Sequence, residues 1–408
     1  MAATHTLIEK KLFESHMMKR KLSKETQINH NRYTPPAGFR SYAEPVYRGS
    51  TVLFKNLKEL RSRFGLNRDG YAYGLHGTPT TYTLEAELAA IEGGNHALLA
   101  SSGLSAISLV DFAFLKTGDD MLIPDDAYNP TQEMGRWLAQ DFGISVRFYD
   151  PMIGAGIADL IQENTKLIWT EVPGSITMEV PDLPAISKAA HAKGVVVALD
   201  NTWSAGLVYD GFAHGADVIV QAVTKYQGGA SDLLMGAVIM KDDDLFRKVG
   251  MARIRLGIGV GVDDVAMVLR SLPTMKLRFD RTGASSLVVA DWLKSRPEVD
   301  KILHPAYPDC PGHEFFKRDF TGTGGLFSFV FHEKYTGEQI DRFIESLTLF
   351  GLGYSWGGTH SLAVPYTISE KRINWKLPQK HVVRLYIGLD DPQDLIADLE
   401  QAMQKLAF

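Results

Sequence analysis

The sequence predicts an α/β protein whose main sheet is mostly parallel. Seven short apolar runs lie between residues 97 and 240, and stretches long enough for a helix separate most of them. The runs are apolar throughout, which is typical of strands that helices cover on both faces. They are ALLA (97–100), DMLIP (120–124), VRFY (146–149), LIWTEV (167–172), VVVAL (195–199), VIVQAV (218–223) and GAVIM (236–240).

The chain is too long for one hydrophobic core, so 408 residues predict at least two domains. Residues 1–75 mix turns with short apolar pieces and are expected to form an arm without a core of its own. Residues 76–270 carry the seven runs. Residues 271–408 are expected to form a smaller α/β domain with a helix at 275–295, strands at 325–331 and 381–389, and a closing helix at 391–406.

Composition and charge restrict the class of ligand. A net charge of -5 argues against a nucleic-acid or anionic-membrane partner, and no apolar stretch approaches the length of a membrane span, so small molecules are expected. The single cysteine, Cys310, excludes an internal disulfide and a multi-cysteine zinc site, and no metal-ligand spacing is present. The sequence therefore predicts a cytoplasmic protein without a metal.

Ligands of such sheets bind beyond the carboxyl ends of the strands, which makes the residues that end each run the candidates. After ALLA, a turn of small residues (SSGLS, 101–105) opens a helix and leaves backbone N–H groups free, which suits a phosphate. After DMLIP comes Tyr128, which can stack on a flat ligand or simply pack on the core. After VVVAL comes Asp200, followed by Thr202; a helix N-cap is the plain alternative for this carboxylate.

Lys225 follows the run at 218–223. A lysine beside a loop is usually solvated, but this strand and the Asp200 strand are consecutive and therefore expected to be neighbours. One crevice would then hold a phosphate cradle, an aromatic ring, a carboxylate and an amine. Pyridoxal 5'-phosphate (PLP) requires this set, with its phosphate at Gly103, its ring at Tyr128, its ring nitrogen at Asp200 and its aldehyde in a Schiff base with Lys225.

With these residues in place, the chain resembles the Cys/Met metabolism (trans-sulfuration) family of PLP-dependent enzymes from about residue 50 to its C-terminus. The stretches that carry the resemblance are YGLHGTPTTYTLE, SSGLSAI, EVPGSITMEVPDLPAI, DNTWSAG, QAVTKYQGGASDLLMGA, HEFFKRDFTGTGGLFSF, YSWGGTHSL and RLYIGLDD. The resemblance implies the aspartate-aminotransferase-like fold, called fold type I, and β-elimination from L-cystathionine in methionine biosynthesis. It also implies a homotetramer built from dimers that share their active sites.

The resemblance also implies roles for individual residues. Catalytic roles fall to Lys225, Tyr128 and Tyr73, the last reaching across from a neighbouring subunit. Cofactor contacts are implied for Gly103, Leu104, Tyr128, Asp200, Thr202, Thr224, Lys225 and Tyr73. Substrate contacts are implied for Arg384, Ser355, Trp356 and Tyr354, with Arg384 as the clamp of the substrate α-carboxylate. A structural ion pair is the plain alternative for Arg384, and a strand-edge aromatic cluster is the alternative for the YSWGG residues.

Two positions depart from the family pattern. Many members have an arginine two residues after the tyrosine that corresponds to Tyr73, where this chain has Leu75. The usual serine three residues before the lysine is Ala222. Both changes remove donors to the cofactor phosphate, so weaker cofactor retention is expected unless His76 or a residue of the arm compensates.

Two rival functions remain at this stage. The first keeps fold and cofactor but changes the reaction, as in cystathionine γ-lyase, cystathionine γ-synthase, methionine γ-lyase or cysteine desulfhydrase; Trp356 and Trp203 tilt the resemblance toward β-elimination. The second is a nucleotide-binding protein that uses GIGVGVDD (257–264) as a glycine-rich loop, a weak signal because no convincing strand precedes it.

Overall fold

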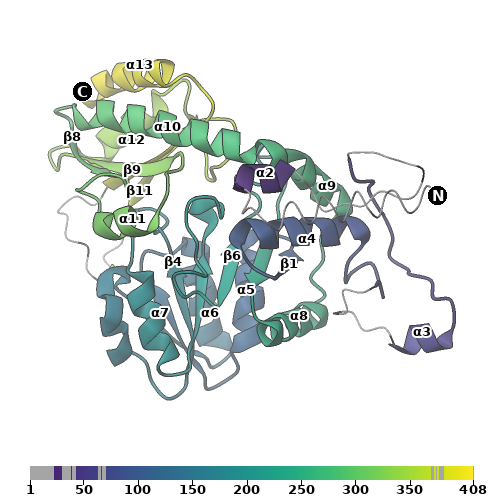
Figure 1. The fold of residues 1–408 in the computed structure, drawn as a ribbon. Helices are drawn as coiled ribbons and strands as arrows, with labels where there is room; N and C mark the ends of the chain where they lie inside the picture. Colours follow the sequence, from purple (N-terminus) through teal and green to yellow (C-terminus); the bar gives the residue numbers. More distant parts are fainter. Residues whose placement is uncertain are drawn as a thin grey trace.

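In the computed structural model, the chain forms two lobes, one above the other (Figure 1). The structure describes residues 23–29, 38, 43–62, 66, 70–368, 372–373, 375 and 381–407. The large lobe, residues 79–271, contains a seven-stranded sheet, and the small lobe, residues 275–407, contains a five-stranded sheet. The arm expected at residues 1–75 lies largely outside the described residues up to residue 42.

The large sheet confirms the predicted α/β class. Its strands are β1 (His96–Ala100), β2 (Asp120–Pro124), β3 (Ser145–Tyr149), β4 (Thr165–Glu171), β5 (Val196–Asp200), β6 (Val218–Gln221) and β7 (Gly236–Met240). Their order is β1-β7-β6-β5-β4-β2-β3. Only β7 runs antiparallel to its neighbours, so the carboxyl ends of β2, β4, β5 and β6 meet at one edge of the sheet.

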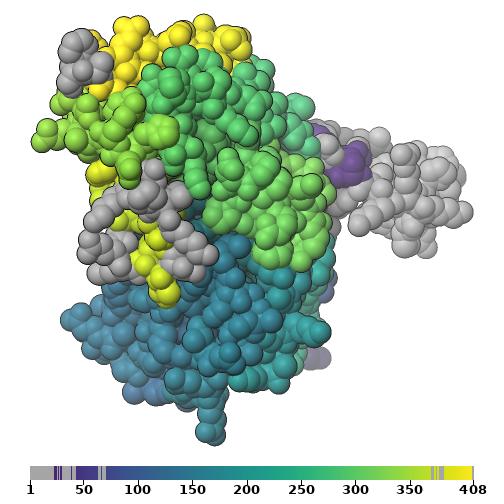
Figure 2. Space-filling model, turned by 90° about the vertical axis from the view of Figure 1, so that its left-hand side faces the viewer, coloured from purple at the N-terminus to yellow at the C-terminus, as the bar shows by residue number. Residues whose placement is uncertain are grey.

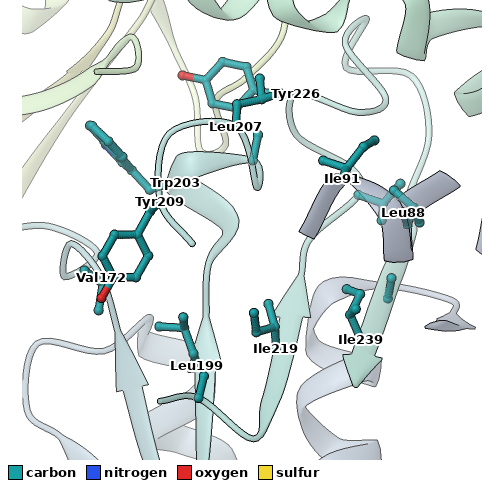
Figure 3. Close-up of a cluster of buried hydrophobic side chains, with 14 of the residues drawn as sticks. Leu88, Ile91, Val172, Leu199, Trp203, Leu207, Tyr209, Ile219, Tyr226 and Ile239 are labelled. Atoms are coloured by element: carbon teal, nitrogen blue, oxygen red, sulfur yellow. The ribbon is translucent and has the colours of Figure 1, made fainter. Parts of the chain in front are cut away.

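The apolar runs divide their side chains between the two faces of the sheet. On β5, Leu199 joins a core with Ile219 of β6 and Ile239 of β7, whereas Ala198 joins the core on the opposite face (Figure 3). Side chains of successive strand residues point to opposite faces, so a continuous apolar run is what a doubly covered sheet needs. The first core contains side chains of α4 (Pro79–Glu92), α7 (Leu183–His191), α9 (Val262–Ser271) and the 3-10 helix η1 (Pro151–Asp159); the second contains side chains of α5 (Gly103–Phe114), α6 (Asn129–Asp141) and α8 (Asp243–Leu256).

The small sheet has the order β10-β11-β12-β9-β8. Strands β9 (Leu326–Phe331) and β12 (His381–Tyr386) were predicted, as were helix α10 (Met275–Lys294) and the closing helix α13 (Pro392–Met403), which continues into η4 (Gln404–Ala407). The sequence patterns did not predict β8 (Val299–Leu303), β10 (Gly351–Leu352), β11 (Leu362–Thr367), α11 (His313–Asp319) or α12 (Gly337–Glu345).

The remaining elements are short: α2 (Lys24–Asn29), α3 (Leu57–Ser62), η2 (Thr202–Ser204) and η3 (Leu272–Thr274). Figure 1 shows α3 away from both lobes at the end of an extended segment. It has no buried residue, and Leu57 and Leu60 are exposed, in keeping with a segment that needs something else to pack on. Among the helices that the structure describes, none is both long and apolar enough to cross a membrane.

Candidate active site

The Lys225 amine lies where the two lobes meet. Lys225 belongs to the turn that follows β6, and its Nζ donates a hydrogen bond of 2.6 Å to Ser355 Oγ of the small lobe. Nζ also lies 5.5 Å from the centre of the Trp356 ring. The lysine of the large lobe is therefore held by the YSWGG segment, residues 354–358, which we call the strap.

Burial and, to a smaller extent, the nearby Arg384 charge lower the pKa of Lys225 to about 8, while the Asp200 charge opposes the shift. An ammonium loses hydration when it is buried, which favours the neutral amine. Near neutral pH a useful fraction of this amine is unprotonated, which is the form that attacks a carbonyl carbon. The site supplies a nucleophilic lysine without needing a separate base.

Asp200 and Lys225 come from neighbouring strands, as the sequence predicted. Asp200 is the last residue of β5, and β5 pairs in parallel with β6. Its Oδ1 accepts hydrogen bonds from the Thr202 N–H (3.0 Å) and the Thr202 hydroxyl (2.5 Å). The N-cap of the 3-10 helix that follows is Asn201 and not Asp200, so the plain alternative of a helix N-cap does not describe this carboxylate. Burial raises the pKa of Asp200, while these bonds and the Lys225 charge oppose the shift.

Thr202 connects Asp200 to the lysine turn. Its Oγ1 donates to Asp200 and accepts the Ala222 N–H at 2.9 Å, so the hydroxyl fixes the carboxylate relative to the residues that lead into Lys225. Thr224 is similarly engaged. Its hydroxyl donates to the Met235 carbonyl (3.2 Å) and accepts the Met235 N–H (3.0 Å), so it must turn away from that carbonyl to donate to a phosphate.

The start of α5 offers two free donors. Ser102 Oγ accepts the Ser105 N–H at 3.0 Å and the Ser102 carbonyl accepts the Ala106 N–H, which leaves the N–H groups of Gly103 and Leu104 without a partner among the described residues. Unpaired donors at a helix N-terminus bind anions. The backbone of Gly103 lies close to Ala222, because a Cβ placed on Gly103 would lie 2.8 Å from the Cβ of Ala222. These features fit the phosphate of PLP.

Sequence reasoning missed Glu171, which anchors Tyr128. Tyr128 precedes α6 without a side-chain cap of its own, and its N–H donates to Glu171 Oε2 at 2.7 Å. The Tyr128 side chain is 42% exposed, so a ring face is open to a ligand. Glu171 ends β4 as Asp200 ends β5, and this shared position at a strand end was the signal that could have identified it.

Arg384 lies in the middle of the small sheet, and its charge has no ion-pair partner among the described residues. It sits on β12 between β9 and β11, is 7% exposed, and its Nη1 donates to the Ser175 carbonyl at 3.2 Å. Its guanidinium lies 5.0 Å from the centre of the Tyr366 ring, and no described carboxylate forms an ion pair with it. Burial lowers the pKa of Arg384. A buried guanidinium without an ion-pair partner is costly, and an incoming carboxylate would relieve that cost.

The strap closes against the lysine backbone. A Cβ on Gly357 would lie 2.8 Å from the carbonyl carbon of Lys225, so only glycine permits this approach. Ser355 has a φ of 101°, which a residue with a side chain rarely adopts. Trp356 packs edge-on against Tyr226, and Tyr354 is 79% exposed at the mouth of the site. The backbone of Ser355 is therefore held in an unfavourable conformation beside the lysine amine.

Tyr73 is the one predicted site residue whose contacts lie elsewhere in the single chain. It forms a bridge with Thr51, and its ring meets His76 edge-on with 6.0 Å between centroids. His76 Nδ1 is buried without a hydrogen-bond partner in the part of the chain that the structure describes. Leu75 lies close to Gly259 of the same chain.

The glycine-rich stretch at 257–264 does not form a nucleotide-binding turn. Gly257 caps the C-terminus of α8 in the left-handed conformation, and α9 begins at Val262. The stretch therefore joins two helices, whereas a nucleotide-binding loop of this kind follows a strand. Cys310, whose exposure the sequence did not reveal, is buried and contacts the Met178 carbonyl.

Comparisons with known proteins agree with this geometry. The family model for "Cys/Met metabolism PLP-dependent enzyme" matches residues 25–404. A putative cystathionine β-lyase of Rhizobium johnstonii is 41% identical over 361 residues, covering 88% of this chain and 90% of the relative. A cystathionine β-lyase of Bordetella avium is 38% identical over 380 residues, covering 92% and 95%. The crystal structure of a cystathionine γ-lyase from Lactobacillus plantarum in complex with L-serine has a TM-score of 0.85 at 26% identity, covering 95% of this chain and 100% of that one.

Proposed function

This chain belongs to the family of Cys/Met metabolism PLP-dependent enzymes, and on that premise we propose that it is a carbon–sulfur lyase acting on L-cystathionine. The products are homocysteine, pyruvate and ammonia, a step of methionine biosynthesis. The observation that carries the proposal is the buried Lys225 amine, which donates to Ser355 and lies within the field of both Asp200 and Arg384. The names of the Rhizobium and Bordetella relatives support β-elimination as the reaction.

The contacts of the site support an assignment of the residues that would hold the cofactor. The N–H groups of Gly103 and Leu104 would bind its phosphate, joined by the Thr224 hydroxyl once it turns from the Met235 carbonyl. Tyr128 would stack on the ring, Asp200 would pair with the ring nitrogen, and Lys225 would hold the aldehyde carbon until the substrate amine replaces it and frees the Lys225 amine. When bound, PLP withdraws electrons from the substrate α-carbon and so makes the α-proton acidic.

The remaining steps use the residues of the chain. Arg384 binds the substrate α-carboxylate through its guanidinium fork and so orients the α-hydrogen toward Lys225. The Lys225 amine accepts the α-proton, assisted by the Tyr128 phenol, and a proton is delivered to the sulfur as the Cβ–S bond breaks. Homocysteine leaves as the thiol, and the three-carbon remainder takes up water to give pyruvate and ammonia. The side chains of Ser355, Trp356 and Tyr354 line the substrate side of the site.

We place Tyr73 in the active site of a neighbouring subunit. Tyr73 and Tyr71 are exposed, as are Leu53, Leu57 and Leu60 of the preceding segment, which argues that these residues pack on a second copy of the chain. A homotetramer built from dimers that share active sites completes the proposal. Its test is the molecular mass in solution, together with mixing of Tyr73→Phe and Lys225→Ala subunits, which restores one intact site if the sites are shared.

The competing reaction is γ-elimination or γ-replacement, which the likeness to the γ-lyase structure favours. These reactions require a second deprotonation, at Cβ, and the residue types of the site do not forbid it. Incubation of the pure protein with L-cystathionine separates the two proposals. Pyruvate and homocysteine support β-elimination, whereas 2-oxobutyrate and cysteine support the γ-reaction. The purified protein is expected to show yellow absorbance, and Lys225→Ala is expected to abolish it. A pure protein without that absorbance would contradict PLP chemistry altogether.

A further inference from the structure

Arg372, from the segment between β11 and β12, is bound by the large lobe on three sides. Its side chain is 9% exposed. Nε donates to Asp125 Oδ1 at 2.9 Å, Nη1 to the Thr177 hydroxyl at 2.9 Å, and Nη2 to both oxygens of Glu179 at 2.7 and 2.8 Å. The backbone N–H of Ile373 adds a bond of 2.5 Å to Asp125 Oδ2. We call this set of contacts the Arg372 latch.

The residues held by the latch lie beside both halves of the proposed amino-acid site. Asp125 directly follows β2 and begins the turn that carries Tyr128. Thr177 and Glu179 follow β4, in the segment whose Ser175 carbonyl accepts a hydrogen bond from Arg384 Nη1. Residues of the same turns are also joined to one another, because the Ser175 N–H donates to the Asp126 carbonyl at 3.1 Å.

The same junction is closed by apolar packing. Ile176 packs against a small core of Leu303, Val330, Ile368 and Val382 from the small lobe. The Ser328 hydroxyl donates to the Ile176 carbonyl at 2.6 Å. Figure 2 shows yellow, C-terminal atoms of the small lobe meeting the blue surface of the large lobe in this region. The latch therefore lies in a buried junction, where an ion pair is screened little.

The geometry suits arginine in particular. Asp125 and Glu179 are 4% and 7% exposed at their side chains, and a planar guanidinium serves both carboxylates and the Thr177 hydroxyl at once. A lysine has the charge but lacks the fork. The adjacent Asp126 carboxylate is buried without a hydrogen-bond partner among the described residues, and burial together with the Glu179 charge raises its pKa well above its ordinary value.

We propose that Arg372 is a positioning residue that sets the spacing between Tyr128 on the large lobe and Arg384 on the small lobe. It acts through the segments that carry these two residues and touches neither substrate nor cofactor. The proposal rests on the role of Arg384 as the α-carboxylate clamp. A correctly spaced site binds the amine and the carboxylate of an amino acid together, whereas a loosened site loses the contribution of the carboxylate first.

The test is equilibrium binding to the PLP-loaded enzyme, followed by the change in cofactor absorbance. The probes are L-alanine and ethylamine, which is L-alanine without its carboxylate. Arg372→Lys is expected to raise the Kd of L-alanine by about tenfold or more and to leave the Kd of ethylamine and the absorbance of the unliganded enzyme unchanged. Arg318→Lys is the matched control, because Arg318 also binds two carboxylates, Asp182 and Asp319, but at the surface.

A double-mutant cycle with Arg384→Lys shows whether Arg372 acts through the clamp. Non-additive effects on L-alanine binding are expected, because a site that has already lost its clamp has little to lose from the latch. Equal weakening of L-alanine and ethylamine, additive effects in the cycle, or an unchanged Kd for L-alanine would each overturn the proposal. If Arg372→Lys does not fold, the combination of Arg372→Met, Asp125→Asn and Glu179→Gln, which removes the charges of all three side chains, is measured instead, with the same expectations.

These measurements need no turnover of cystathionine. A chain that releases 2-oxobutyrate instead of pyruvate would refute β-elimination and leave the result for Arg372 intact. Conversely, normal L-alanine binding in Arg372→Lys would refute the latch even if pyruvate is the product.

Discussion

Glu171 and Asp200 are paired in register as the last residues of two neighbouring parallel strands, so their carboxylates leave the sheet side by side. The two carboxylates interact with different residues of the site. Asp200 acts on Lys225, whereas Glu171 binds the N–H of Tyr128 and lies within the field of Arg384. Burial, with the Asp200 charge added, raises the pKa of Glu171 well above its ordinary value. Two anions at this edge would repel each other, so burial and the Asp200 charge both favour the protonated form of Glu171.

The raised pKa of Glu171 predicts that Glu171→Gln hardly changes the free energy of unfolding near pH 7, because the amide keeps the acceptor for the Tyr128 N–H and carries no charge. Glu171→Leu loses the acceptor and is expected to cost about 1 kcal/mol, as for the loss of a helix cap. Folding takes up a proton at Glu171, so its contribution to stability falls as pH rises through the raised pKa, and Glu171→Gln removes that slope. Urea unfolding between pH 5 and 8 measures both effects; equal costs for Gln and Leu near pH 7 would contradict a protonated Glu171.

The pKa of Lys225 predicts how the apoenzyme takes up its cofactor. Only the neutral amine attacks an aldehyde, and burial lowers the pKa of Lys225 to about 8. The rate at which the apoenzyme regains cofactor absorbance is therefore expected to rise with pH and to level off above about pH 8. A rise that continues to the range of an ordinary lysine, near 10.4, would show that the amine is hydrated and not held against Ser355.

The backbone conformation of Ser355 predicts that a glycine at this position raises stability while it lowers activity. Its φ of 101° suits glycine, so Ser355→Gly is expected to gain up to about 1 kcal/mol of stability from relief of strain. Ser355→Ala keeps the strain and loses only the hydroxyl that accepts the hydrogen bond from Lys225 Nζ. Both variants are expected to lose activity, and only the glycine variant to gain stability. Thermal unfolding and lyase activity of the two variants, measured together, separate the roles of backbone and hydroxyl; a stabilised alanine variant would contradict this account.

The phosphate cradle predicts a gain of cofactor affinity. Ala222 lies against Gly103, and serine there would add a hydroxyl beside the two free N–H groups. Ala222→Ser is expected to slow the loss of PLP on dialysis, because one more donor contributes about 1 kcal/mol, or a several-fold change in Kd. Ala222→Val is the matched control, since it adds volume without a donor and is expected to hasten the loss. If serine brings no gain, the phosphate does not lie beside residue 222.

Residues near one another at strand ends were predictable, whereas contacts between lobes were not. The continuous apolar runs at 195–199 and 218–223 identified two buried strands, and consecutive parallel strands usually lie side by side, so Asp200 and Lys225 could be placed together. Arg372 gave no such signal. Its partners lie roughly two hundred residues earlier in the chain, and no local pattern records a contact at that separation.

The missed strands have physical reasons as well. β8 contains Asp300 and Lys301 and has a register shift against β9, so its apolar pattern is broken. β11 contains Pro365, which reads as a break in a strand. The antiparallel direction of β7 also leaves no mark in its sequence, because a strand covered on both faces is apolar whichever way it runs.

Two buried aspartates predict opposite pH dependences of stability. Asp111 accepts one bond, from Trp169 Nε1 at 2.8 Å, and burial raises its pKa to about 7. Folding takes up a proton there, so stability falls as pH rises from about 4 to 7, by at most about 4 kcal/mol. Asp398 accepts N–H bonds from Thr348 and Leu349, and although burial opposes it, these bonds lower its pKa. Its contribution is present above the unfolded pKa and is lost as pH falls.

Asp111→Asn keeps the acceptor for Trp169 and removes the proton requirement, so it is expected to stabilise the protein above pH 7 and to have little effect near pH 4. Asp398→Asn is expected to do the reverse, with a cost near pH 7 that shrinks toward pH 3 as the parent carboxylate becomes protonated. Guanidinium unfolding at several pH values measures both variants against the parent. A cost for Asp111→Asn at pH 8 would mean that the charged carboxylate is stabilised inside the core, and that burial does not control its protonation.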